Sequence, residues 1–291
     1  MNVLLTGANG FIGTYIKYNI DKKYNLLLAS TSLKKDISKN QLTLSSNYSD
    51  VSEILNSYHV DCIIHTASII PNSFDDSNYE LFLKNIEMMN NLYSFSVKNN
   101  IKKFIYLSSF GSMKNPAELD IKDFYTMSKI VGEHFCSMMR SKKIHATSLR
   151  IPSPYGEHQK VNNVFKIFVK KALKNEEITL YGKGEREQNF IYVGNILHAI
   201  ELLLEKSTFG NYDLVSENNL SMKELAEAVI TKTQSESKLI YLNVIDDNEN
   251  YRPSYSAQKI KNELGYIERY SFDKSLENYI SWVKYEDSNN C

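Results

Sequence analysis

The sequence predicts a doubly wound α/β fold, in which helices cover both faces of a parallel sheet, followed by a smaller α/β region. Three observations predict it. Short apolar runs alternate with helical patterns over the first half of the 291-residue chain, a glycine-rich turn follows the first apolar run, and the alternation weakens after about residue 152. Continuous apolar runs are typical of parallel strands that are buried on both faces.

The first half contains four apolar runs and one partly polar segment that we interpret as strands. They lie at residues 3–5, 26–28, 62–64, 104–107 and 146–151. Helices are expected between them, at residues 11–16, 51–55, 81–97 and 125–139, because apolar side chains recur there every three or four positions. This order of strands and helices predicts the parallel sheet.

The second half predicts a smaller substrate-binding domain that is interleaved with the first. Helices are expected at residues 161–173 and 195–204, and short strands at 178–180, 190–193 and 212–215. Ser221 and Glu224 have the spacing of a capping box that opens another helix, and the tail from residue 254 carries one or two more. The first domain should span residues 1–155, with about 188–215 returning to it, and the second should span 156–187 and 216–291.

Composition excludes several classes of protein. The 34 lysines and arginines equal the 34 aspartates and glutamates, whereas nucleic-acid binders and polybasic membrane-surface proteins carry a basic excess. No apolar run reaches the roughly 18 residues of a membrane-spanning helix. The spacing of Cys62, Cys136 and Cys291 is not that of a disulfide framework or a metal site. The six histidines also lack the spacing of a metal site. We therefore expect a cytoplasmic protein with no metal, nucleic-acid or membrane partner.

A glycine-rich segment, TGANGFIG at residues 6–13, lies between the first predicted strand and helix. Gly7 permits a tight turn, Gly10 lets a pyrophosphate approach the backbone, and Gly13 lets the helix pack closely on the sheet. The helix N-terminus adds unpaired N–H groups and the positive end of its dipole. This strand–turn–helix context predicts a dinucleotide-binding Rossmann domain.

The glycine spacing resembles that of the extended short-chain dehydrogenases/reductases, and more narrowly that of the NAD-dependent epimerase/dehydratase family, which acts on nucleotide-linked sugars. Further segments are similar to the family's and keep its order. They are DCIIHTAS at 61–68, LSS at 107–109, YTMSK at 125–129, LRIPSPYG at 149–156 and FIYV at 190–193. The resemblance covers nearly the whole chain.

The resemblance implies a catalytic group of Ser109, Tyr125 and Lys129. In the family the tyrosine is the acid/base on the sugar, the lysine also holds the nicotinamide ribose, and the serine hydrogen-bonds the reacting oxygen. Tyr125 and Lys129 are four residues apart on a predicted helix, so they share a face. We expect the lysine ammonium to lower the pKa of the phenol from its usual value near 10. Ser108 and Ser112 remain alternatives to Ser109.

The resemblance also implies cofactor-binding residues, mostly in the loops after the predicted strands. They are Gly7, Asn9, Gly10, Phe11, Ile12, Gly13, Ser30, Thr31, Lys34, Asn47, Tyr48, Thr66, Ala67, Ser68, Tyr125, Lys129 and Ile151. His65, beside this set, is expected to be structural or to line the cofactor rather than to act in catalysis.

The end of the second predicted strand lacks the carboxylate that NAD-preferring members use to bind the adenine ribose. Ser30 and Thr31 stand there, with Lys34 just beyond, and such residues can accept a 2′-phosphate. The sequence therefore favours NADP(H). NAD(H) remains possible, because Lys34 can equally belong to a solvated loop.

The sequence motifs specify the family more narrowly than they specify the reaction. The family's 4,6-dehydratases carry an Asp-Glu pair after the catalytic hydroxyl residue, whereas Phe110 and Gly111 stand here, so dehydration is disfavoured. The NADP preference favours a reductase of a 4-keto sugar nucleotide with Tyr125 as proton donor. The alternatives are a C4 epimerase with tightly bound NAD and a non-catalytic NAD(P)-binding regulator, although such regulators typically lose the tyrosine or the lysine.

The substrate region departs from the family pattern. The residues implied to bind substrate are Ser109, Ser153, Asn163, Arg186 and Arg252. Ser153 stands where many members have asparagine, and Gln188 replaces a frequent arginine. Arg186 and Arg252 each offer a fork of donors for a diphosphate, although both can be ordinary surface residues.

A homodimer is also implied by the resemblance. Family members often pair through a four-helix contact that includes the helix carrying the catalytic tyrosine. The predicted helix at residues 81–97 is apolar enough to take part in such a contact.

Overall fold

The computed structural model describes residues 1–32, 36, 40–71, 76–110, 123–244, 246 and 248–289. The chain forms two compact units. Unit 1 contains Met1–Ile151, Ala199–Leu214 and Gln258–Tyr266, and unit 2 contains Pro152–His198, Val215–Ala257 and Ile267–Cys291.

Unit 1 is built on a seven-stranded parallel sheet of order β10-β6-β5-β4-β1-β2-β3. Its strands are β1 (Asn2–Thr6), β2 (Asn25–Ser30), β3 (Gln41–Thr43), β4 (Cys62–His65), β5 (Lys103–Ser109), β6 (His145–Ile151) and β10 (Asn211–Asp213). The strand order reverses between β1 and β4, and doubly wound sheets bind ligands at the carboxyl ends of the strands at such a point. The predicted fold class is confirmed.

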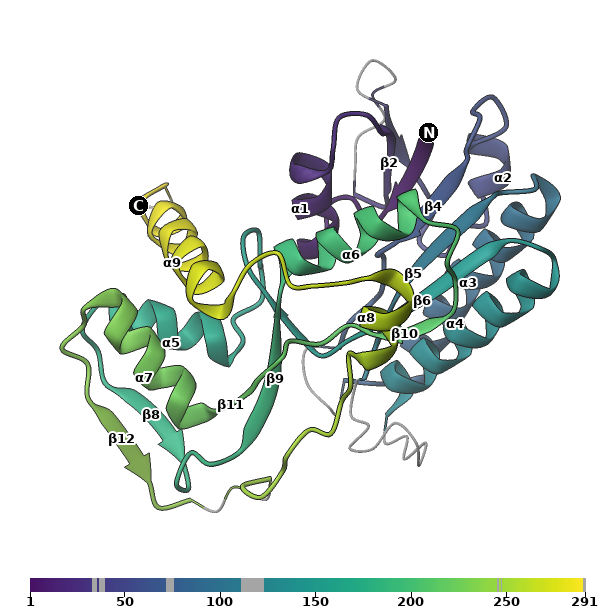
Figure 1. Cartoon of the computed structure of the whole chain (residues 1–291). Coiled ribbons are helices and arrows are strands. Elements are labelled where there is room, and N and C mark those ends of the chain that lie inside the picture. Colours follow the sequence, from purple (N-terminus) through teal and green to yellow (C-terminus); the bar gives the residue numbers. More distant parts are fainter. Residues whose placement is uncertain are drawn as a thin grey trace. The chain divides into compact units, whose positions relative to one another are not determined.

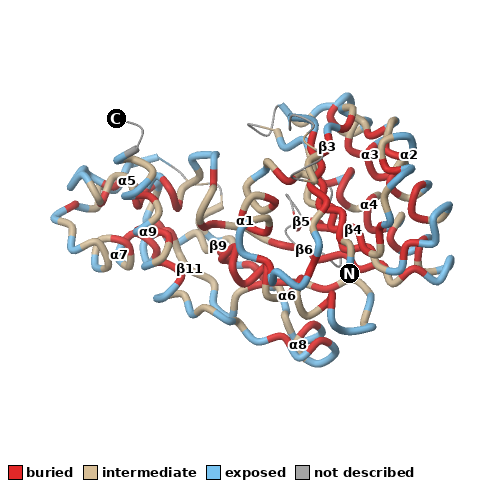
Figure 2. Tube along the Cα trace, turned by 90° about the horizontal axis from the view of Figure 1, so that it is seen from above, coloured by how far each residue is buried: buried red, intermediate tan, exposed pale blue. Residues whose placement is uncertain are grey.

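Helices cover both faces of this sheet. Those with residues in unit 1 are α1 (Phe11–Asn19), α2 (Val51–Ile54), α3 (Tyr79–Lys98), α4 (Phe124–Ser141), α8 (Gln258–Leu264) and α6 (Val193–Glu205), which begins in unit 2. Figure 1 shows α3 and α4 along one face of the sheet and α1 on the other. Figure 2 shows that buried positions follow the strands and the inner sides of α3 and α4. Leu92, Phe104 and Cys136 belong to the core between them.

The described residues of unit 2 form two small sheets and, besides the start of α6, three helices. The first sheet holds β7 (Ser153–Tyr155), β9 (Glu187–Tyr192) and β11 (Asn219–Ser221), and the second pairs β8 (Ile178–Tyr181) with β12 (Leu239–Leu242). The helices are α5 (Val164–Leu173), α7 (Met222–Thr233) and α9 (Phe272–Asn289). Phe165 of α5 packs on Tyr155 and Phe190, with ring centroids 4.1 Å and 5.3 Å apart. Ser221 and Glu224 form the predicted capping box.

The domain boundaries differ from those predicted. The predicted return to the first domain at about residue 188 begins instead at Ala199, because β9 pairs with β7 and β11 rather than with the large sheet. Residues 258–266, predicted in the second domain, belong to unit 1. In unit 2, α5 starts at Val164 rather than at 161, because the Asn163 side chain caps the helix. None of the described helices is long and apolar enough to cross a membrane.

Candidate active site

The turn between β1 and α1 requires glycine for steric reasons. Gly7 has φ +73°, and a Cβ atom there would lie 2.6 Å from the backbone nitrogen of Ala67. A Cβ atom on Gly13 would lie 2.1 Å from the carbonyl oxygen of Gly7, so only glycine lets α1 approach the turn this closely. Gly10 holds the N-cap position and has no side chain to pair with the first N–H groups of α1. This helix end is therefore suited to a phosphate.

Most of the other predicted cofactor residues lie around this turn or at the ends of neighbouring strands. Asn9 lies in the turn, Phe11 and Ile12 begin α1, Ser30 and Ile151 end β2 and β6, Thr31 follows β2, and Thr66, Ala67 and Ser68 follow β4. The Thr66 hydroxyl donates to the Thr6 carbonyl at 2.7 Å, and the Asn9 amide donates to the Ser32 hydroxyl at 3.2 Å. These bonds tie the ends of β4 and β2 to β1 and its turn.

Three of the predicted cofactor residues are placed differently or lie outside the described residues. Tyr48 is only 1% exposed and its phenol hydrogen-bonds with Thr6, so only its backbone could face a cofactor. Asn47 accepts a 2.9 Å bond from Asn91 of α3 at its carbonyl oxygen. Lys34 lies outside the described residues. The contacts predicted for these three residues stay predictions.

The predicted catalytic residues lie together at the start of α4. Asp123 caps the helix by accepting the Thr126 N–H at 2.8 Å. The hydroxyls of Ser109, at the end of β5, and of Ser68 lie near the Tyr125 phenol and act to lower its pKa. Lys129 donates from Nζ to the Leu107 carbonyl at 3.0 Å, and the same Nζ lies 5.6 Å from the centre of the Tyr125 ring.

Burial governs the protonation of this group. It raises the pKa of Tyr125 to about 12, which the neighbouring Ser109 hydroxyl offsets only in part, and it lowers the pKa of Lys129 to about 7. The expectation that the lysine would lower the pKa of the phenol is therefore wrong. Desolvation is the largest cause for both groups, since burial disfavours the phenolate and the ammonium alike.

The structure distinguishes Ser109 from Ser108. Adjacent side chains of a strand point to opposite faces, and only Ser109 faces Tyr125. The Ser108 hydroxyl instead donates to a carboxylate oxygen of Glu133 at 2.7 Å. Ser112, the other alternative, lies outside the described residues.

Glu133 lies at the centre of an ion-pair network that was not predicted from the sequence. It lies on α4, one turn beyond Lys129, and its side chain is 6% exposed. Arg150 of β6 donates to it from Nε at 2.9 Å and from a terminal nitrogen at 2.7 Å, and it also approaches Asp213 of β10 at 3.6 Å. The four-residue spacing from Lys129 could have indicated that Glu133 shares the catalytic face of the helix.

His65 contacts Thr6, the last residue of β1 before the glycine-rich turn. Its Nδ1 lies 2.7 Å from the Thr6 hydroxyl, and its ring stacks on Tyr106 with centroids 5.6 Å apart. Burial, helped by the Lys129 charge, lowers the pKa of the imidazole to about 3, so it stays neutral. No group of three metal-ligating side chains occurs among the described residues.

Of the predicted substrate residues in unit 2, Arg186 lines a cavity of about 460 Å³. Val164 and Phe168 of α5, Leu180 of β8 and Met222 of α7 form apolar walls of this cavity. Asp246 faces Arg186 there, with Oδ2 3.7 Å from the arginine Nε. Nothing in the sequence indicated this carboxylate beside the arginine.

The other predicted substrate residues of unit 2 do not line this cavity. Asn163 caps α5 just before Val164, and Arg252 is paired with Glu187 at 2.9 Å. The Ser153 hydroxyl accepts a hydrogen bond from the Gln188 amide, so these two residues contact each other.

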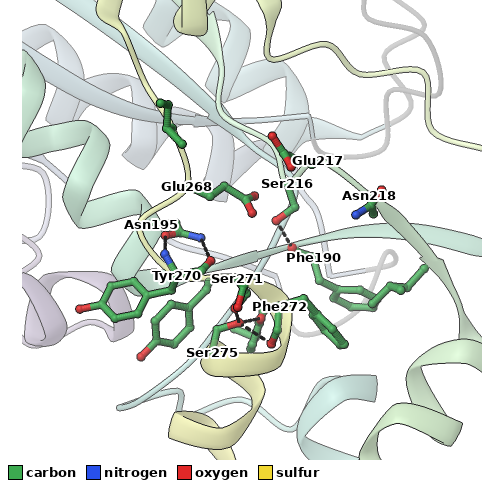
Figure 3. A pocket seen from close by; sticks show the side chains of 14 residues that line it. Phe190, Asn195, Ser216, Glu217, Asn218, Glu268, Tyr270, Ser271, Phe272 and Ser275 are labelled. Carbon is green, nitrogen blue, oxygen red and sulfur yellow. Dashed lines mark hydrogen bonds between the residues drawn. The ribbon is translucent and has the colours of Figure 1, made fainter.

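A second cavity in unit 2, of about 300 Å³, contains none of the predicted substrate residues (Figure 3). Asn195 both donates to and accepts from the Tyr270 backbone at 2.9 Å, and the Ser216 hydroxyl donates to the Phe190 carbonyl at 2.7 Å. These bonds hold the walls of the cavity together.

A family model described as the NAD-dependent epimerase/dehydratase family matches residues 3–214. A putative UDP-glucose 4-epimerase of Methanocaldococcus jannaschii is 26% identical over 97% of this chain and 98% of its own. The dTDP-4-dehydro-6-deoxyglucose reductase of Escherichia coli is 23% identical over 97% of both chains. The crystal structure of a Bacillus cereus UDP-glucuronic acid 4-epimerase with UDP-glucuronic acid and NAD superimposes with a TM-score of 0.80, at 19% identity over 98% of this chain and 100% of that one.

Proposed function

The chain belongs to the NAD-dependent epimerase/dehydratase family, and from this premise we propose that it reduces a 4-keto sugar nucleotide with Tyr125 as the proton donor. The observation that carries the proposal is the placement of the Ser109 hydroxyl beside the buried phenol of Tyr125, with Lys129 one turn further along the same helix. A proton donor must be protonated before it reacts, and the buried phenol is protonated at neutral pH.

Each residue of the group has a role in this reaction. The nicotinamide, when bound, supplies a hydride to the keto carbon. Tyr125 gives its phenolic proton to the carbonyl oxygen, which becomes the hydroxyl of the product, and the neighbouring Ser109 hydroxyl orients that proton. Lys129, with its pKa of about 7, can exchange a proton with its surroundings at neutral pH.

A C4 epimerase with tightly bound NAD is the second candidate. It is supported by the Methanocaldococcus jannaschii relative, which matches nearly the full chain at slightly higher identity than the Escherichia coli reductase does. Epimerisation needs the same three side chains, but its first step oxidises the sugar and requires Tyr125 as a base. A raised pKa makes the phenol a weaker acid as well as a less populated base, so it does not distinguish the two reactions.

We also propose NADP(H) as the preferred cofactor. Ser30 ends β2, Thr31 and Ser32 follow it, and no carboxylate stands among these described residues to bind a ribose 2′-hydroxyl. The Bacillus cereus structure contains NAD, so its cofactor argues for the alternative.

The identity of the bound cofactor tests these proposals directly. The protein would be purified without added nucleotide and denatured, the released nucleotide identified, and the emptied protein titrated with NADPH and NADH. We expect little retained cofactor and tighter binding of NADPH. Stoichiometric NAD with weak NADPH binding would refute the reductase and support the epimerase, and binding of neither cofactor would contradict an NAD(P)-dependent enzyme.

The nucleotide-linked end of the substrate is proposed to occupy the 460 Å³ cavity, with its phosphates toward Arg186. Arginine binds phosphate through two parallel hydrogen bonds, and the apolar walls suit the flat face of a base. Isothermal titration of the protein with UDP, dTDP, CDP and GDP tests this assignment, because at least one of them should bind.

A homodimer through α3 and α4 is proposed by resemblance to the family. Apolar side chains are exposed on these helices at Tyr79 and Leu83 of α3 and at Phe124 and Met127 of α4. Light scattering of the purified protein tests this, and Leu83→Glu should shift a dimer toward monomer.

A further inference from the structure

We propose that Lys166 is a positioning residue, which ties helix α9 to the loop at residues 156–163 and so fixes the end of α5 that lines the nucleotide cavity. The inference rests on the proposed function, because it assigns a role at the cavity where the nucleotide is proposed to bind. Lys166 lies in the first turn of α5, and its side chain is 3% exposed.

The Lys166 ammonium is held from three sides. It donates to the carbonyl oxygen of Gln159 at 2.7 Å, pairs with Glu286 of α9 at 2.7 Å, and lies 4.9 Å above the ring of Trp282 of α9. A buried charge is costly unless it is paired and hydrogen-bonded, so these contacts restrain both the loop and the helix.

The loop has a second attachment to the same helix. The Tyr279 hydroxyl of α9 donates to the Gln159 side-chain oxygen at 2.9 Å, and the Gln159 amide donates to the Val161 carbonyl at 3.1 Å. Tyr279 and Gln159 are buried, at 0% and 4% exposed. The loop is therefore fixed at its main chain by Lys166 and at its side chain by Tyr279.

The loop leads directly into the wall of the cavity. Asn163 ends the loop and caps α5, accepting the Lys166 N–H at 3.0 Å. Val164, the next residue, lines the cavity, as do Ile167 and Phe168 one turn later. A loosened loop would shift the cap and the first turn of α5, and small displacements of a binding wall weaken binding strongly.

The test compares Lys166→Met with Lys170→Met. Lys170 lies one turn further along α5 and pairs with Asp287 of α9 at 3.3 Å, but its side chain is 33% exposed. The two variants therefore remove the same charge from the same pair of helices, once in the interior and once at the surface. The probe is whichever of UDP, dTDP, CDP and GDP binds the unaltered protein most tightly.

We expect Lys166→Met to weaken binding of the probe about ten-fold and to leave the nicotinamide cofactor's affinity within about two-fold. Lys170→Met should change neither affinity by more than about two-fold. A purely structural role would instead lower the affinity for both ligands as the folded fraction falls. Equal probe binding by Lys166→Met and the unaltered protein would overturn the inference.

Two further measurements make the test decisive. If Lys166→Met does not fold, Tyr279→Phe removes only the second attachment and buries no unpaired charge, and it too should weaken probe binding without affecting the cofactor. Trp282 is the chain's single tryptophan, so its emission reports on this cluster, and probe binding should change it. Failure of all four nucleotides to bind the unaltered protein would refute the proposed function instead. Normal probe binding by Tyr279→Phe, with unchanged Trp282 emission, would refute the positioning role.

Discussion

Replacing Glu133 with glutamine should destabilise the protein far more than the loss of a surface charge would. The Glu133 side chain is 6% exposed and receives two hydrogen bonds shorter than 3 Å from Arg150, which is itself only 25% exposed. Removing one partner of a buried pair leaves the other charge uncompensated, at a cost of roughly 3–5 kcal/mol. Because Asp213 still lies 3.6 Å from Arg150, we expect the lower end, about 3 kcal/mol.

Urea unfolding followed by far-UV circular dichroism measures this cost, and a double-mutant cycle separates the pair from its surroundings. Glu133→Gln, Arg150→Met and the double variant should give a coupling energy of about 2 kcal/mol. The control is Glu80→Gln on α3, which breaks an exposed pair with Lys84 and should leave the midpoint unchanged. A coupling energy below about 0.5 kcal/mol would show that the network behaves as a surface pair, and would refute the reasoning.

Three further predictions concern α4 and the strand beside it. Gly132→Ala should cost about 1–3 kcal/mol of unfolding free energy in urea, because its Cβ would lie 2.4 Å from the Tyr106 hydroxyl; an unchanged midpoint would mean that the ring moves aside. Lys129→Met should abolish turnover yet raise stability at pH 7 by roughly 3 kcal/mol, since the lysine has a pKa of about 7 when folded and near 10.5 when unfolded. Between those two pKa values the unfolded chain binds one proton more than the native protein, so the unaltered protein should gain stability from pH 7 to 10. The difference in unfolding free energy between Lys129→Met and the unaltered protein should therefore become smaller as the pH rises. A difference that stays constant would contradict the lowered pKa. Ser109→Ala should reduce turnover about 100-fold, whereas Ser108→Ala should keep turnover and cost about 2 kcal/mol of stability; the reverse result in paired assays would exchange their roles.

The large sheet could be predicted because its evidence is local. The apolar runs at β1, β2, β4 and β5 are continuous, and helical patterns lie between the predicted strands, so neighbouring residues alone indicate the fold. The strands β3, β7, β11 and β12 were not predicted, and each has only three or four residues. The residues of β12, LIYL, are an apolar run that was overlooked. β7 is Ser153–Tyr155 with a proline at its centre, and it is a strand only because it pairs with β9, more than thirty residues later.

The spacing of Tyr125 and Lys129 allowed the catalytic residues to be proposed. It did not indicate their protonation states. Tyr125 and Lys129 share a helix face in any α-helix, so the sequence places them together. Whether the lysine lowers the pKa of the phenol depends on how much water both groups lose. Only the packing of β5 and α4 reveals that burial dominates, and it reverses the expected direction for Tyr125.

The two ligand sites differ in how much of their chemistry is visible in a sequence. The proposed cofactor site is made largely of backbone, so the steric need for Gly7 and Gly13 leaves a fixed spacing that one segment displays. The proposed substrate site is made of side-chain pairs whose members are distant along the chain. Arg186 meets Asp246 sixty residues later, and Lys166 meets Glu286 of the last helix. An anionic substrate at Arg186 must compete with the Asp246 carboxylate, so the sequence alone, which showed only the arginine, overstates how strongly this site attracts phosphate.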